Sequence, residues 1–163
     1  MELEKILEEY QKTDLQRRQG IFASIFILQN RLQTACDKLD PELSMKQWLL
    51  LAMAGTKEEA MTLTELGALM GCSRQNVKKI AQTLEKKGFI KLEKKESDSR
   101  ALCVLRDEKM RGYAEKVGAM QGEVLNLLFQ EFSEDEIEKL YQCTMKLYEG
   151  IMKVEKYVEE CHE

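Results

Sequence analysis

The 163-residue sequence has one histidine and one proline, and it has no apolar run of the roughly 18 residues that a membrane-spanning helix needs. The histidine, His162, stands next to the last residue, so most hydrolytic, metal-dependent and histidine-based acid/base chemistry is not expected. The five cysteines are odd in number and form no C-x-x-C pair, which favours free thiols over disulfides or a zinc site. We therefore expect a cytoplasmic protein without a membrane segment, a metal or a cofactor.

Enzyme activity is not expected either, because the sequence has no glycine-rich phosphate loop and no nucleophile–base pair. With so little proline and only nine glycines, the chain is predicted to be mainly helical with short loops. Apolar residues recur at three- and four-residue spacing from Ile21 to Leu39, which predicts a helix that ends before Pro41. Three further helix starts carry the spacing of a capping box: Ser44 with Gln47, Thr62 with Glu65, and Ser133 with Glu136.

The middle of the chain predicts a helix-turn-helix followed by a β-hairpin. A short helix from Thr62 ends at Gly71, and Ser73 is the expected N-cap of the next helix, which ends at Gly88. Alternating apolar residues then predict two strands, Phe89–Lys94 and Ala101–Leu105, with residues 95–100 as a charged tip between them. Asp107 is a candidate cap for the long helix that follows.

The charge distribution is uneven. Nine basic and four acidic residues between Ser73 and Arg100 give this segment a net charge of +5, which leaves −9 for the rest of a chain whose total is −4. A local basic segment on an acidic body is a feature of nucleic-acid binding, although a solvated helix face and a charged hairpin explain the same pattern.

The last predicted helix has apolar residues at nearly heptad spacing from Ile137 to Val158. We interpret this stripe as a subunit interface, with packing inside one protomer as the alternative. The predicted organisation is a dimerisation helix region (1–43), a winged helix-turn-helix domain (44–106) and C-terminal dimerisation helices (107–163).

This order of elements resembles the MarR family of bacterial transcriptional regulators. The most specific stretch is residues 63–106, with the "LEKKGFI" join and the Asp-x-Arg of the wing at Asp98-Ser99-Arg100. The resemblance implies a mainly α fold with a small β-hairpin, in which long dimerisation helices flank the winged helix-turn-helix. It also implies a homodimer that binds double-stranded DNA, and a small-molecule effector, of unknown identity, bound where the dimer helices meet the DNA-binding unit.

The DNA-binding residues follow from the resemblance and from side-chain chemistry. Near the start of the helix after Ser73, arginine suits guanine, and glutamine or asparagine suits adenine, in the major groove. The lysines are expected to contact phosphates, and Asp98 to direct Arg100 into the minor groove. The predicted set is Ser73, Arg74, Gln75, Asn76, Lys78, Lys79, Thr83, Asp98 and Arg100.

Some assignments stay open. Phe22, Phe26, Trp48 and Met120 are candidates to line an effector cavity, but aromatic and methionine residues at helical spacing are also ordinary core. Cys36 and Cys72 are either structural thiols or oxidant sensors. The leading function is a dimeric transcriptional regulator, with repression as the expected direction. The alternative is a winged-helix protein-interaction module that has lost DNA binding, which the acidic pI and the Lys95-Glu96-Ser97 run in place of the family's wing proline favour.

Overall fold

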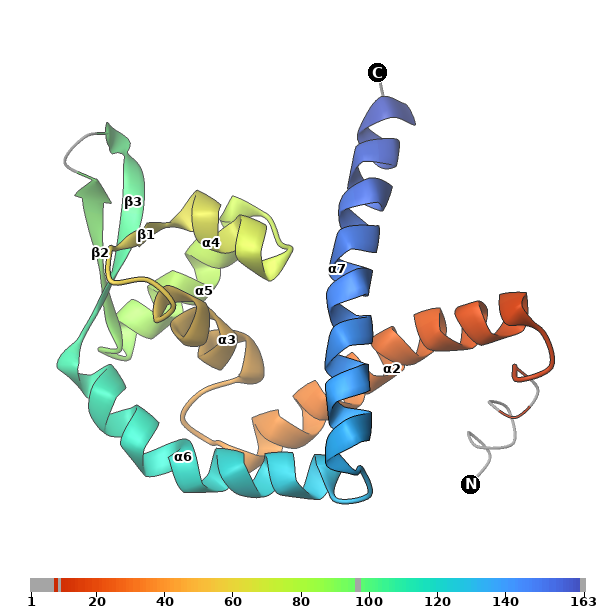
Figure 1. Cartoon of the computed structure of the whole chain (residues 1–163). Helices are drawn as coiled ribbons and strands as arrows, with labels where there is room; N and C mark the ends of the chain where they lie inside the picture. Colours follow the sequence, from red (N-terminus) through yellow and green to blue (C-terminus); the bar gives the residue numbers. More distant parts are fainter. Residues whose placement is uncertain (1–7, 9, 96–97, 162–163) are drawn as a thin grey trace. The chain divides into compact units, whose positions relative to one another are not determined.

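The computed structural model describes residues 8, 10–95 and 98–161, with the side chains of 98 and 99 left out. It divides into two compact units, residues 1–112 and 113–163, each described by itself below. Helix α6 (Glu108–Phe129) runs from the first into the second (Figure 1). The predicted functional boundaries at 43/44 and 106/107 stay a prediction.

Four helices of the first unit begin where short polar side chains cap them. They are α2 (Asp14–Leu39), α3 (Met45–Ala54), α4 (Leu63–Met70) and α5 (Arg74–Lys86). The capping boxes predicted at Ser44 and Thr62 are both confirmed, with the side chain and the backbone N–H of each cap residue bonded to the third helical residue. Helix α2 ends at Leu39, and Asp40 follows as its C-cap directly before the proline, so the helix ends before Pro41 as predicted.

The turn between α4 and α5 depends on a glycine with a left-handed backbone. Gly71 has φ 62°, and the N–H of Cys72 donates to the carbonyl of Gly67 at 2.9 Å. Ser73 then caps α5 by accepting from the N–H of Asn76. A second left-handed residue, Gly88 (φ 78°), ends α5, and the N–H of Phe89 donates to the carbonyl of Leu84 at 3.0 Å. The helix-turn-helix is therefore formed as predicted.

A three-stranded antiparallel sheet follows, in the order β1-β3-β2. Strands β2 (Ile90–Lys95) and β3 (Asp98–Arg106) form the predicted hairpin, and β1 (Met61–Thr62) adds a strand that was not predicted, with Met61 opposite Val104. The strands also extend further than expected. Arg100, predicted for the tip, lies inside β3, because pairing continues to Lys95 opposite Asp98 across an irregular register.

The core of the first unit is apolar and centres on α5. Leu50, Leu66, Val77, Leu84 and Phe89 are fully buried, and they come from α3, α4, α5 and the segment that leads into β2. Burying a side chain of this size contributes roughly 1.5–3 kcal/mol. This packing fixes α5 from its inner face and leaves its outer face to solvent.

The second unit contains the rest of α6 and helix α7 (Glu134–Cys161), which starts at the predicted capping box of Ser133 and Glu136. Helix α7 has no buried residue, and its apolar stripe is exposed, including Leu147 and Tyr148. The apolar residues of α2 are similarly exposed, including Phe22 and Ile25. Within the described residues, no helix combines the length and apolarity that crossing a membrane requires.

Candidate nucleic-acid interface

Helix α5 has one buried face and one polar face. Val77, Ala81 and Leu84 are buried at helical spacing, while Ile80 beside them is only half-buried. The seven residues of this region predicted to contact DNA are all exposed: Ser73, Arg74, Gln75, Asn76, Lys78, Lys79 and Thr83. The structure thus brings these side chains together on one accessible surface.

Three of these side chains already form hydrogen bonds within the protein. The Ser73 hydroxyl accepts from the N–H of Asn76, and the Thr83 hydroxyl donates to the carbonyl of Lys79 at 3.0 Å. The Arg74 guanidinium reaches strand β3 of the hairpin, since its Nη2 donates to the carbonyl oxygen of Arg100 at 3.3 Å. The Ser73 contact is the predicted N-cap, whereas the Arg74 contact was not predicted, because it depends on how the hairpin folds back beside α5.

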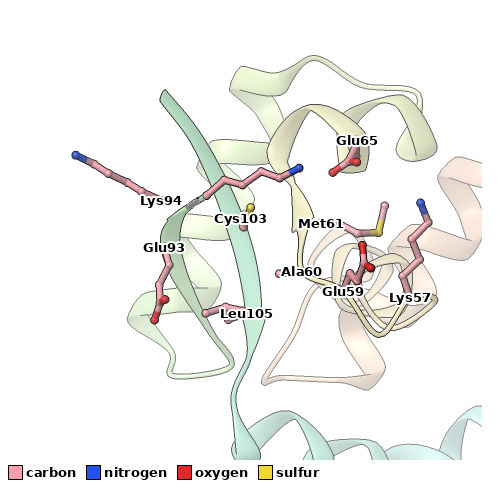
Figure 2. Close-up of a pocket in the computed structure, with 10 residues that line it drawn as sticks. Lys57, Glu59, Ala60, Met61, Glu65, Glu93, Lys94, Cys103 and Leu105 are labelled. Atoms are coloured by element: carbon pink, nitrogen blue, oxygen red, sulfur yellow. The ribbon is translucent and has the colours of Figure 1, made fainter. Parts of the chain in front are cut away.

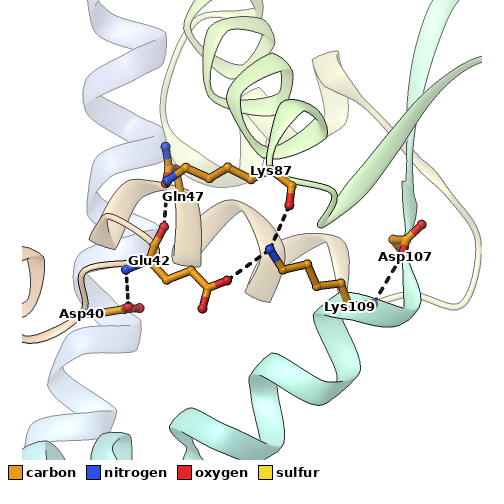
Figure 3. A network of polar contacts seen from close by, with 6 residues as sticks. All are labelled: Asp40, Glu42, Gln47, Lys87, Asp107 and Lys109. Atoms are coloured by element: carbon orange, nitrogen blue, oxygen red, sulfur yellow. Dashed lines mark hydrogen bonds and ion pairs between the residues drawn. The ribbon is translucent and has the colours of Figure 1, made fainter.

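The C-terminal end of α5 is held by a network of two lysines (Figure 3). Lys87 Nζ donates to the carbonyl of Glu42 at 2.7 Å and to Oε1 of Gln47 at 3.0 Å. Lys109 Nζ donates to the carbonyl of Lys87 at 2.9 Å, lies 3.1 Å from the Glu42 carboxylate and sits 4.3 Å from the centre of the Phe89 ring. The network connects the segment before α3, the end of α5 and the start of α6.

The network also agrees with the prediction that Asp107 caps α6. The Asp107 carboxylate accepts from the N–H of Lys109 at 3.3 Å and lies 3.6 Å from Lys91 Nζ. The aspartate was predictable from local spacing. The lysines of the network were not, because their partners lie as far as 45 residues away in the sequence.

The β2–β3 hairpin forms the wing of the predicted fold. Arg100 is exposed on β3, as a minor-groove contact requires, and Asp98 begins the same strand. The Asp98 side chain, predicted to direct Arg100, lies outside the part of the chain that the structure describes. Glu85 is a residue that sequence reasoning missed: from the last turn of α5, its Oε1 accepts from the N–H of Leu92 at 2.8 Å.

A shallow pocket of about 480 Å³ lies against the three-stranded sheet, next to the loop that leads into β1 (Figure 2). Met61, Cys103 and Leu105 line it together with lysines and glutamates, one of which is Glu65. The N–H and hydroxyl of Thr62 hold the pKa of Glu65 below its usual value, and Lys95 and Lys57 lower it further. Lysines and glutamates both line the pocket, so its lining has no single sign of charge.

The residues proposed for an effector cavity do not line this pocket: Phe22, Phe26, Trp48 and Met120. Phe22 and Phe26 instead form an edge-to-face pair on exposed α2, with ring centres 5.2 Å apart. Cys36 and Cys72 are half-buried free thiols. In the described ranges, no group of three or more histidine, cysteine or carboxylate side chains is arranged to hold a metal ion.

Comparison with known proteins matches this chain to one family. Residues 43–102 match the model of the MarR family. The transcriptional repressor MprA of Escherichia coli (strain K12) is 29% identical over 107 residues, which are 66% of this chain and 61% of MprA. The chain thus matches less than two thirds of that relative's length.

Solved structures agree on the fold. A MarR transcriptional regulator from Methanosarcina mazei Go1 superposes with a TM-score of 0.75 at 17% identity, over 83% of this chain and 99% of that one. A MarR/EmrR family regulator from Acinetobacter sp. ADP1 superposes with a TM-score of 0.74 at 19% identity, over 83% and 97%. The fold is therefore that of the MarR winged-helix proteins.

Proposed function

Because residues 43–102 match the model of the MarR family, we propose that this chain is a transcriptional regulator of that family and binds double-stranded DNA as a homodimer. The observation that carries the proposal is the exposed polar face of α5, whose opposite face is fixed by Val77, Ala81 and Leu84 in the core. A helix about 10–12 Å across fits the major groove of B-DNA, which is about 12 Å wide.

Helix α5 enters the major groove with its N-terminal end toward the bases. Gln75 and Asn76 read base edges, since their amides match the donor and acceptor atoms of adenine. Lys78 and Lys79 bind phosphates, together with the hydroxyl of Ser73, and these contacts set position rather than sequence preference. Thr83 joins them when its hydroxyl turns from the Lys79 carbonyl to a phosphate. Arg74 belongs to the same surface.

The wing binds beside the major groove. Arg100 inserts into the flanking minor groove, where narrow A·T-rich stretches attract arginine. In this role Asp98 directs the guanidinium of Arg100 by accepting hydrogen bonds from it. The position of Arg100 supports this role, because it lies within β3 at the irregularity in the β2–β3 register and its side chain is exposed.

The exposed apolar stripes of α7 and α2 support a homodimer. Tyr141 and Tyr148 of α7 are each 63% exposed in the protomer, and Phe22 of α2 is 66% exposed. Apolar faces of this extent are characteristic of subunit interfaces. A two-fold dimer places its recognition helices about 34 Å apart, so the operator is a near-palindrome with half-sites one helical turn apart.

We propose repression as the direction of regulation, with release by a small-molecule effector. The similarity to MprA, a transcriptional repressor, supports the direction. The competing function is a winged-helix module that binds a protein instead of DNA, which the net charge of −4 favours. The +5 charge of residues 73–100 favours DNA, because the segment that carries it includes α5 and the wing.

The salt dependence of duplex binding tests this function. Duplexes selected from a random pool by the wild-type protein serve as targets, and the binding constant is measured from low to physiological salt. For each phosphate neutralised, log K is expected to fall by about 0.9 per unit of log salt concentration. Lys78→Ala is expected to weaken binding to all duplexes alike and to reduce the slope by about one unit.

Lys12→Ala is the matched control, because it removes the same charge from an exposed position ahead of α2. It is expected to leave the slope unchanged. A wild-type slope near zero, or equal effects of the two substitutions, would contradict DNA binding through α5 and favour the protein-interaction module.

A further inference from the structure

Two side chains of α5 hold the wing, one from each end of the helix. At the N-terminal end, Arg74 Nη2 donates to the carbonyl of Arg100 in β3 at 3.3 Å. In the last turn, Glu85 Oε1 accepts from the N–H of Leu92 in β2 at 2.8 Å. The two residues are 11 positions apart in α5, which is about 16 Å along the helix axis. Both strands of the hairpin are thus attached to α5 at well-separated points.

The Glu85 contact satisfies a group that the sheet leaves open. Strand β2 is at the edge of the sheet, where N–H groups that point away from β3 have no strand partner. The N–H of Leu92 finds its acceptor in Glu85. An edge strand that bonds to a helix side chain is held at a defined distance from that helix. The Glu85 contact therefore fixes the distance between α5 and β2.

The Arg74 contact acts further along the wing, at Arg100 itself. The bond goes to the backbone carbonyl of Arg100, so it constrains where this part of β3 lies and leaves the Arg100 side chain exposed. Arg74 and Glu85 hold opposite strands of one hairpin, and together they restrict its rotation about the short connection after α5.

We propose that Arg74 and Glu85 are wing-positioning residues, which fix the wing relative to α5 so that both reach adjacent grooves of the duplex together. This inference rests on the proposed DNA binding. A wing held in place before binding loses less conformational freedom when it binds, which increases affinity. Arg74, whose position suggests a guanine contact, then affects sequence preference through Arg100, at the flanking base pairs.

The first test uses the DNA-free protein. Hydrogen exchange and amide NMR signals are compared between wild type, Arg74→Ala, Glu85→Ala and Glu85→Gln. Glu85→Ala is expected to accelerate exchange of the Leu92 amide, whereas Glu85→Gln keeps an acceptor oxygen and the protection with it. Arg74→Ala is expected to shift the amide signal of Ala101, which shares a peptide unit with the Arg100 carbonyl. Unchanged Leu92 and Ala101 amides would overturn the positioning role, whether or not the protein binds DNA.

The second test is a double-mutant cycle between Arg74 and Arg100 on selected duplexes with A·T or G·C flanks. Arg74→Ala is expected to reduce the preference for A·T flanks and to leave base preferences within the half-sites unchanged. The double variant is expected to bind within about twofold of Arg100→Ala alone, because the two residues act through one contact. Glu85→Gln is expected to retain the flank preference that Glu85→Ala reduces.

Lys78→Ala is the matched control for lost charge, and it is expected to weaken binding to both kinds of flank equally. Additive effects of Arg74→Ala and Arg100→Ala, with a changed base preference inside the half-site, would overturn the inference and make Arg74 a base-reading residue. Failure of the wild type to bind any duplex would refute the proposed function, and the DNA-free measurements would still decide the positioning of the wing.

Discussion

Replacing Gly67 by alanine should destabilise the helix-turn-helix, although alanine normally stabilises a helix. Gly67 lies in α4, and a Cβ atom there would stand 2.7 Å from the carbonyl oxygen of Cys72 and 3.6 Å from Cγ2 of Val77. The oxygen belongs to the backbone of the turn, which also receives its shape from Gly71. It has no side-chain torsion through which to move away, so the turn itself must shift.

The two opposing terms have known sizes. Alanine in place of glycine inside a helix gains about 1 kcal/mol, and forced overpacking of a tight core costs about 1–3 kcal/mol. The free energy of unfolding should therefore fall by up to about 2 kcal/mol. Gly112→Ala is the matched control, because this helical glycine of α6 has no atom within 4 Å of the added Cβ. It should gain about 0.5–1 kcal/mol.

Urea unfolding at one fixed protomer concentration measures both variants, since the proposed dimerisation would make stability depend on concentration. The expected result is a change of opposite sign at the two positions. Duplex binding by Gly67→Ala should also weaken, because the displaced turn carries the first residues of α5. If Gly67→Ala were as stabilising as Gly112→Ala, the close contact with the Cys72 carbonyl would not constrain the turn.

Three further changes probe the interface, a cap and the core. Leu147→Glu should convert the dimer to monomer in sedimentation, whereas Gln142→Glu on the same helix should not; a wild-type monomer at micromolar concentration would contradict the interface. Because the pKa of Glu65 is lowered, its ionised carboxylate stabilises the fold above the usual pKa of 4.5. This stabilisation is lost as the pH falls through the lowered pKa. The stability advantage of wild type over Glu65→Gln should therefore shrink in urea unfolding as pH falls below 4.5, and a constant difference would exclude this linkage. Phe89→Ala, at a fully buried position, should cost about 3–5 kcal/mol in the same assay, and a loss below 1 kcal/mol would show that the site collapses around the smaller residue.

The helix starts could be predicted because their determinants are local. Each capping box joins residues three positions apart, as at Thr62 and Glu65, so the sequence contains both partners of every bond. The left-handed turn at Gly71 is local in the same sense, because glycine adopts a positive φ without steric cost. The polar face of α5 follows from helical periodicity alone.

Strand limits and side-chain partners could not be predicted in this way. Strand β1 has two residues, and it exists because Met61 lies opposite Val104, 43 positions later. The position of Arg100 within β3 likewise depends on pairing across the hairpin. For Glu85 the sequence offers only a charged residue on an exposed helix face, and its bond to the Leu92 N–H becomes visible only when β2 is placed beside α5.

The acidic total charge is compatible with the proposed DNA binding, because electrostatic interactions in salt are local. At physiological ionic strength they decay over about 8–10 Å, so a phosphate at α5 responds mainly to the residues around it. The segment from Ser73 to Arg100 carries +5 and the rest of the chain −9. In the proposed complex, this arrangement attracts the duplex to α5 and the wing and repels it from other faces. The same charge pattern then orients the protein on the duplex and supports its sequence selectivity. Non-specific binding through the acidic faces is weak, so the contacts of α5 and the wing determine where on the DNA the protein binds.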